Sequence, residues 1–193
     1  MSFAFIEKTV NSLVESNVIV EDDKEIVEYG IEQGLLILLN ILTTVTIGFV
    51  FDMVLESLIY LVAFIPLRSY VGGYHARTKI NCYISSVVII SIVLASIKYV
   101  NWSTSTAIIL TILSGIIIFI CAPRADVNKP FDEIELIVFR KRAHIICSIE
   151  LLLIFIFFNL GYKTISLCIL MGLISCVAML YMDMLKHLLV KKD

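Results

Sequence analysis

The sequence predicts an all-helical integral membrane protein, with six hydrophobic transmembrane helices and an N-terminal amphipathic surface helix. Of its 193 residues, 60% are hydrophobic and only 17% are charged. Soluble domains carry about 25% charged residues, so this composition excludes an ordinary soluble domain. The apolar residues also gather in runs near the length of about 20 residues that spans a bilayer. We expect residues 1–193 to form a single membrane-embedded domain.

The N-terminal segment, residues 1–23, is predicted to be amphipathic. Apolar residues recur at helical spacing, with charged and polar residues between them. The apolar residues are Phe3, Ile6, Val10, Leu13 and Val14. Such a helix lies on the membrane surface, or it packs on the cytoplasmic face of the protein itself. The pattern leaves both arrangements open.

Six hydrophobic runs follow, at 34–51, 53–67, 80–97, 99–123, 143–162 and 164–182. The first is free of charge throughout. The second is short for a span and contains Pro66, so we expect it to tilt little, to thin the bilayer or to end in irregular backbone. The fourth carries Trp102, a residue type that favours the membrane interface. The polar segment 124–142, before the fifth run, is predicted to be a basic cytoplasmic loop.

The distribution of Lys and Arg predicts the orientation in the membrane. With six spans, both termini share a side with the polar turn 68–79 and with the loop 124–142, and that side holds 13 of the 15 Lys and Arg residues. Only Lys98 and Lys163 fall on the other side. Cytoplasmic segments carry the excess of positive charge. We therefore expect a multi-pass protein of the cell membrane, with both termini and the turn on the cytoplasmic side.

The segment between the second and third runs, residues 68–82, holds the pattern with the most chemical meaning. His75 can act as a base for the thiol of Cys82, and nearby cations supply the positive potential that keeps a nucleophilic thiolate ionised. These cations are Arg68, Arg77 and Lys79. From these residues alone, two interpretations stay open: a cysteine nucleophile that a histidine activates, or a connector with cytoplasmic anchors in which the cysteine is inert.

The spacing of this pair predicts a break in the chain. One continuous helix over 75–82 would hold the two side chains about 10 Å apart along its axis, whereas proton transfer needs roughly 3 Å or one bridging water. Gly72-Gly73 permits a turn that leads His75 back over the start of the next helix. Cys82 then lies in the first turn of that helix, where the helix dipole favours a thiolate.

The same segment resembles a known family. The matching residues are Arg68, the Gly-Gly-Tyr-His-Ala sequence of 72–76, and Cys82 seven positions after His75. A second match is Ala122-Pro123 followed by Asn128-Lys129-Pro130. Together with the chain length and the order of hydrophobic runs, this pattern resembles the accessory gene regulator B (AgrB) family of membrane-embedded cysteine peptidases.

The resemblance implies a cysteine endopeptidase of quorum sensing, with His75 and Cys82 as the catalytic pair. The implied substrate is a short autoinducing pro-peptide whose acidic C-terminal tail is removed on the cytoplasmic face, after which the peptide cyclises to a thiolactone or lactone. A non-catalytic membrane peptide exporter or peptide-binding partner is the alternative from another class. The expected partners are the pro-peptide and membrane lipid. We expect no nucleic acid, cofactor or metal, and the sequence leaves open whether the chain forms a homodimer.

Further residues are expected to support the catalytic pair. Arg68 contributes positive charge, and backbone N–H groups near Gly73 are placed to hold an oxyanion. Glu32 is a candidate to orient His75 as a third group. A basic run, Arg140-Lys141-Arg142, would anchor the chain on anionic lipid, and the resemblance adds a second role as a landing site for the acidic tail.

Other arrangements of the same residue types compete with this interpretation. His144 and Cys147 are three residues apart and would meet on one face of a helix. His75, Cys82, Cys121 and His144 would supply two His and two Cys to a zinc ion, although their spacing is far from that of usual zinc ligands. The carboxyl group of Glu150, inside the fifth run, is costly there and is therefore a functional candidate. Cys168 and Cys176, in the sixth run, are predicted to be core residues.

Overall fold

The computed structural model describes the backbone of residues 4–16, 18–72, 79–124 and 132–190, and the side chains of this set apart from 4, 79 and 186–190. All its regular elements in these ranges are helices, and they are α1 (Ala4–Glu15), the 3₁₀ helix η1 (Glu21–Asp23), α2 (Lys24–Phe51), α3 (Val54–Val71), α4 (Lys79–Tyr99), α5 (Thr104–Cys121), α6 (Glu133–Asn159) and α7 (Lys163–Val190). Six of these helices are long and apolar enough to cross a membrane. This result confirms the predicted fold class.

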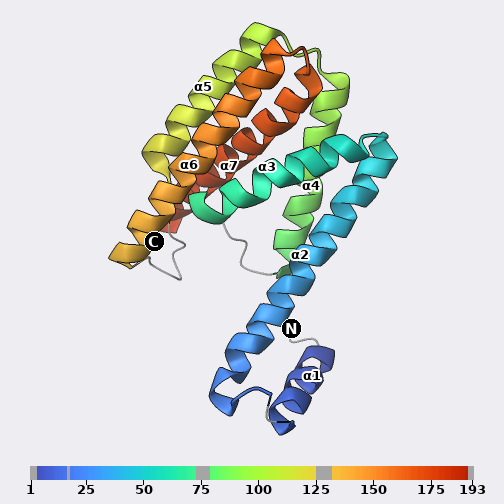
Figure 1. The fold of residues 1–193 in the computed structure, drawn as a ribbon, viewed down its shortest axis with the longest axis vertical. Helices are drawn as coiled ribbons and strands as arrows, with labels where there is room; N and C mark the ends of the chain where they lie inside the picture. Colours follow the sequence, from blue (N-terminus) through green and yellow to red (C-terminus); the bar gives the residue numbers. More distant parts are fainter. Residues whose placement is uncertain (1–3, 17, 73–78, 125–131, 191–193) are drawn as a thin grey trace. The chain divides into compact units, whose positions relative to one another are not determined.

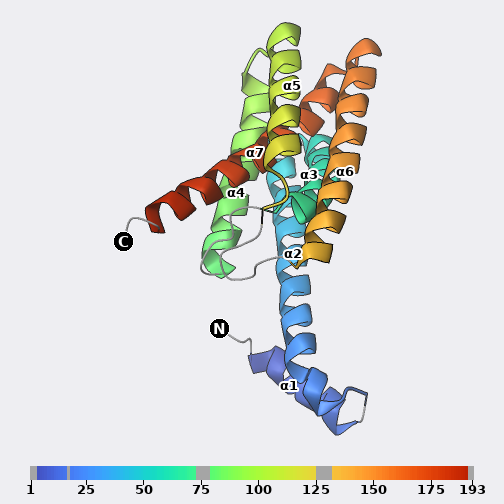
Figure 2. The ribbon, with the colours of Figure 1, turned by 90° about the vertical axis from the view of Figure 1, so that its left-hand side faces the viewer.

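The chain divides into two compact units, residues 1–43 and 44–193. In the first unit, α1 lies beside the N-terminal end of α2 (Figures 1 and 2). Ile6 and Val10, one helical turn apart on α1, are buried, whereas Glu7 and Lys8 are exposed. The segment therefore has the predicted apolar and polar faces.

The second unit is built around α7, which contacts α3, α4, α5 and α6. Figure 1 shows α5, α6 and α7 side by side, with α3 lying across α7. In the 18-residue apolar stretch of α7, 61% of the residues are buried, whereas the corresponding share is 28% or less in the other five candidate spans. α7 is thus the central helix of the bundle, and the others present much of their apolar surface outward, as expected of helices in lipid.

Small and hydroxyl-bearing side chains hold α3 against α7. A Cβ added to Gly172 would lie 3.4 Å from the Cβ of Ala63, so the two helices meet closely at this point. Next to it, the hydroxyl of Tyr60 donates a hydrogen bond to the hydroxyl oxygen of Ser175 at 3.2 Å. Close approach through small residues and hydrogen bonds between helices are what stabilise contacts inside a membrane.

Two boundaries differ from the sequence prediction. α3 continues through Pro66 to Val71 instead of ending in irregular backbone near 67. α6 begins at Glu133, so residues 133–142, expected in the basic loop, are helical. The reason is a capping box, in which Asp132 accepts a hydrogen bond from the backbone of Glu133 and the Glu135 carboxylate accepts one from the backbone of Asp132.

The helix termini of residues 44–193 form two groups. We call the group with the ends of α3 and α5 and the start of α6 the Gly72 end. We call the group with the ends of α4 and α6 and the starts of α5 and α7 the Trp102 end. At the Trp102 end, Lys98 donates to the carbonyl oxygen of Phe51 and Lys163 donates to that of Trp102. Lys98 and Lys163, which are predicted to lie on the opposite side of the membrane from the other 13 Lys and Arg residues, are therefore at the same end of the bundle.

Candidate functional site

The predicted site residues are described only in part. His75, Gly73 and Arg77 lie within 73–78, outside the described residues. The distance between His75 and Cys82 therefore stays a prediction. What the structure does describe is the nucleophile candidate, the end of α3 that leads into 73–78, and the basic run on α6.

Cys82 lies in the first turn of α4, which begins at Lys79. Its side chain is exposed and is not in a disulfide. This position agrees with the predicted start of a helix between 75 and 82. Its exposure distinguishes this thiol from the fully buried thiols of Cys147, Cys168 and Cys176.

The end of α3 is fixed by contacts on both sides. The Arg68 guanidinium donates to the carbonyl oxygen of Gly72, one turn further along. From the segment after α5, the backbone N–H of Arg124 donates to the carbonyl oxygen of Val71 at 3.0 Å. Gly72 and Arg124 also form a parallel β-bridge. The last described residue before 73–78 is therefore attached to a second chain segment.

Gly72 is required by this attachment. Its φ of 72° lies in the left-handed region, which L side chains rarely adopt. A Cβ added there would overlap the carbonyl oxygen of Arg124 and would lie 3.1 Å from its carbonyl carbon. The first glycine of the Gly-Gly pair thus allows the two backbones to approach.

An ion pair that the sequence analysis did not identify lies behind this bridge. Arg124 Nε is 2.6 Å from Asp183 Oδ2, and the Asp183 side chain is fully buried on α7. The two residues are 59 positions apart, so no local spacing indicates the pair. The available signal was weak: each charge directly follows an apolar run, Arg124 after 99–123 and Asp183 after 164–182.

The three residues of the basic run, Arg140-Lys141-Arg142, have different surroundings. Arg142 donates to the Tyr70 hydroxyl at 3.0 Å, and its guanidinium lies 5.3 Å from the centre of the Tyr70 ring. Tyr70 in turn makes an edge contact with Phe139 of α6. Arg140 and Lys141 are exposed on the same helix. Arg142 thus joins α6 to the last turn of α3, while its two neighbours face outward at the same end.

The competing Cys/His pair has a different environment. His144 Nε2 is 3.2 Å from the carbonyl oxygen of Phe119, and the two rings are 4.6 Å apart. Because a carbonyl oxygen only accepts, this ring nitrogen carries a proton. Cys147, one turn later, is fully buried. In this arrangement His144 connects α6 to α5, and the buried thiol is not accessible to a peptide backbone.

The other candidates also find places in the fold. Glu150 is buried on α6, and its Oε2 has no hydrogen-bond partner within the described part of the chain. Glu32 is buried in the unit of residues 1–43, and its role as an orienting group for His75 stays a prediction. Among the described residues, no group of three or more His, Cys, Asp or Glu side chains is placed to hold a metal ion. This finding does not test the possible zinc site of two His and two Cys residues, because His75 lies outside the described residues.

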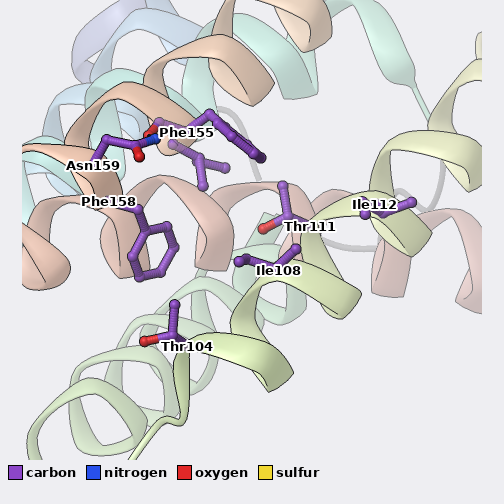
Figure 3. Close-up of a pocket in the computed structure, with 8 residues that line it drawn as sticks. Thr104, Ile108, Thr111, Ile112, Phe155, Phe158 and Asn159 are labelled. Carbon is purple, nitrogen blue, oxygen red and sulfur yellow. The ribbon is translucent and has the colours of Figure 1, made fainter.

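A groove of about 180 Å³ lies between α5 and α6. Figure 3 shows Thr104, Thr111, Phe158 and Asn159 along it. Thr104 begins α5 and Asn159 ends α6, so the groove reaches the Trp102 end. Cys82 is near the other terminus of its helix, and the groove is therefore not part of the candidate site.

Comparison with known proteins supports the resemblance. The family model for Accessory gene regulator B matches residues 6–181. The chain is 28% identical to a putative AgrB-like protein of Clostridium perfringens strain SM101, over 91% of this chain and 90% of that protein. It is 31% identical to accessory gene regulator protein B of Staphylococcus intermedius, over 58% of this chain and 52% of that protein. The corresponding Staphylococcus aureus Newman protein is 32% identical, over 56% and 57%.

No solved structure matches the chain. The family match covers all six candidate spans up to residue 181, and with them the segment 68–82 and the basic run on α6. The chain therefore belongs to the accessory gene regulator B family.

Proposed function

We propose that this protein is a membrane-embedded cysteine endopeptidase that removes the acidic C-terminal tail of a short quorum-sensing pro-peptide and promotes cyclisation of the remainder. The observation that carries the proposal is the position of Cys82. It is an exposed thiol in the first turn of α4, seven residues after His75, in a chain of the accessory gene regulator B family.

The proposed reaction has two steps. In the first, His75 takes the proton of Cys82, the thiolate attacks the scissile carbonyl carbon, and the amide C–N bond breaks as His75 returns the proton to the leaving nitrogen. The tail departs and a thioester remains on Cys82. In the second, a thiol or hydroxyl of the bound peptide attacks this thioester, which gives a thiolactone or lactone and restores the Cys82 thiol.

A position at the membrane favours the second step. Water competes with the peptide's own nucleophile for the thioester, and hydrolysis would yield a linear product. A site bordered by lipid-facing helices limits the access of water to such reactive intermediates. The oxyanion that forms in each step needs N–H donors, and the backbone near Gly73 and the first turn of α4 is the proposed source.

The contacts at the Gly72 end suggest where the acidic tail binds. Arg142 is held against Tyr70, in the last turn of α3. Arg140 and Lys141 are exposed on the same helix. We assign these two cations to the tail, because carboxylates pair with exposed Arg and Lys side chains. The excess of positive charge at this end also assigns it to the cytoplasm.

The test is cleavage of a synthetic pro-peptide with an acidic tail by the full chain in lipid nanodiscs, followed by mass spectrometry. Cys82→Ala should abolish cleavage, whereas Cys121→Ala and Cys147→Ala should retain it, because these thiols are not the nucleophile. An inactive Cys147→Ala together with an active Cys82→Ala would move the reaction to the competing pair. Binding of the peptide without any cleavage would favour an exporter or a peptide-binding partner.

A further inference from the structure

We propose that Arg124 and Asp183 are positioning residues for the peptidase, because their ion pair holds the end of α3, and Gly72 at this end precedes His75 by three positions in the sequence. The proposal rests on the proposed function, since it assigns a role to residues that support the same site. It names two residues that neither the family pattern nor the spacing of charges identified.

Arg124 contacts both α3 and α7. Arg124 uses two groups at once: its backbone N–H donates to the carbonyl oxygen of Val71, and its side chain Nε pairs with Asp183 at 2.6 Å. The backbone contact holds α3, and the side-chain contact holds α7. The residue therefore ties the end of α3 to the central helix of the bundle.

The two members of the ion pair differ in burial. The Asp183 side chain is fully buried, and that of Arg124 is 30% exposed. A buried charged carboxylate is costly unless it is paired, so the contact with the Arg124 guanidinium is favourable. Because the carboxylate is fixed in α7, the arginine that pairs with it has one preferred position. The backbone of Arg124, and with it the bridge to Gly72, follows from that position.

The contact between Arg124 and the end of α3 lies close to His75 in the sequence. Only Gly73 and Tyr74 separate Gly72 from His75 in the sequence. We therefore expect a displacement of Gly72 to change the position of His75. A shift of about 1 Å in reacting groups lowers a reaction rate by about 100-fold. The pair thus acts on the chemical step through the position of His75, without contact with the substrate.

The test uses Asp183→Asn in the full chain in nanodiscs. This neutral isostere leaves Arg124, which is partly exposed, in reach of solvent. The single-turnover rate of peptide cleavage should fall by about 100-fold, while the affinity for the peptide changes less than about threefold. The matched control is Asp52→Asn: Asp52 is exposed near the Trp102 end with a φ of 55°, a conformation that Asn tolerates. This control should cleave at the parent rate.

Two more variants separate positioning from loss of folding. Asp183→Glu keeps the charge and should recover at least tenfold of the lost rate. The double variant Arg124→Gln with Asp183→Asn removes both charges, so that no uncompensated charge remains, and should insert in the membrane yet cleave slowly. A parent-like rate in Asp183→Asn or in the double variant overturns the proposal, and so does an affinity that falls in proportion to the rate.

A readout without activity completes the test. Spin labels at the exposed positions Ser69 on α3 and Tyr181 on α7 report the distance between these helices by pulsed electron paramagnetic resonance. Asp183→Asn should broaden this distribution, and Asp52→Asn should leave it unchanged. An unchanged distribution in Asp183→Asn overturns the positioning role. If Cys82→Ala still cleaves the peptide, the proposed function fails, whatever the labels report.

Discussion

Replacing Gly72 by alanine should destabilise the protein more than an alanine substitution at a glycine with open surroundings. Gly72 has a φ of 72°, and an added Cβ would overlap the carbonyl oxygen of Arg124. Gly161 provides the matched comparison. Its φ is 85°, but no heavy atom lies within 4 Å of the position that a Cβ would take. The two sites share a positive φ and differ in the clash.

The expected free-energy changes follow from these two features. A non-glycine residue in a sparsely populated backbone region costs about 1–3 kcal/mol, and both variants carry this cost. Forcing an extra carbon into a packed site costs a further 1–3 kcal/mol or so, which applies to Gly72→Ala alone. The free energy of unfolding should therefore fall by about 2–6 kcal/mol in Gly72→Ala and by about 1–3 kcal/mol in Gly161→Ala.

Buried thiols give a direct assay for this difference. Cys147, Cys168 and Cys176 are fully buried, so a thiol-reactive fluorophore labels them only as the helices separate on heating. At about 2–4 °C per kcal/mol, the labelling midpoint of Gly72→Ala should lie at least about 2 °C below that of Gly161→Ala. Equal midpoints, or a lower one for Gly161→Ala, would show that the bridge between Gly72 and Arg124 is not a close contact.

Three further predictions test other parts of the structure. Arg140→Gln combined with Lys141→Gln should weaken binding of the acidic-tailed peptide by roughly 2- to 30-fold, at about 0.2–1 kcal/mol for each exposed pair. The same variant should not change the binding of a control peptide whose tail carboxylates are replaced by amides. Equal losses for both peptides would show that the acidic tail does not bind to these two residues. Gly172→Ala should be tolerated, because an added Cβ would lie at ordinary contact distance from α3. Gly172→Leu should lower the free energy of unfolding by about 1–3 kcal/mol, because its larger side chain does not fit. Equal midpoints of thermal thiol labelling for the two variants would contradict this packing. In intact cells, a cysteine at Ser69 should resist an impermeant thiol reagent while one at Asn101 reacts, and the reverse pattern would invert the assigned orientation.

The sequence was sufficient for the fold class, because long apolar runs in a chain with few charges have few alternatives to membrane-spanning helices. It was less informative about helix boundaries. α3 continues past Pro66 because its last turn is closed by contacts from Arg68 and from the segment after α5. The early start of α6 had a local signal in Asp132 and Glu135, because a capping box is readable from the sequence, although the polar composition of 124–142 predicts a loop.

The centre of the bundle was not predictable from hydropathy. α2 and α7 are almost equally apolar. However, 11% of the apolar stretch of α2 is buried, whereas 61% of the apolar stretch of α7 is buried. Lipid and protein interior are both apolar, so hydropathy does not separate them. A better signal was the set of small and polar residues on α7, such as Gly172 and Ser175, which meet α3.

The position of Cys82 in a helix was predictable from local sequence, whereas contacts between distant residues were not. The placement of Cys82 in the first turn of a helix followed from the glycine pair and the spacing to His75. The pairing of Arg124 with Asp183 joins residues 59 positions apart, and no periodic pattern connects them. The roles of Glu32 and Glu150 also depend on tertiary contacts and stay predictions.

The most direct test of the account is to trap the thioester on Cys82. A variant that keeps Cys82 as its only cysteine is mixed with a pro-peptide whose cyclising Cys or Ser is replaced by Ala, so that the second step cannot occur. Intact-protein mass spectrometry should then show the enzyme heavier by the peptide without its tail, with the free tail in equal amount. The adduct should be absent when His75 is changed to Ala. Cleavage without any adduct, or an adduct that forms equally without His75, would contradict the proposed catalytic pair.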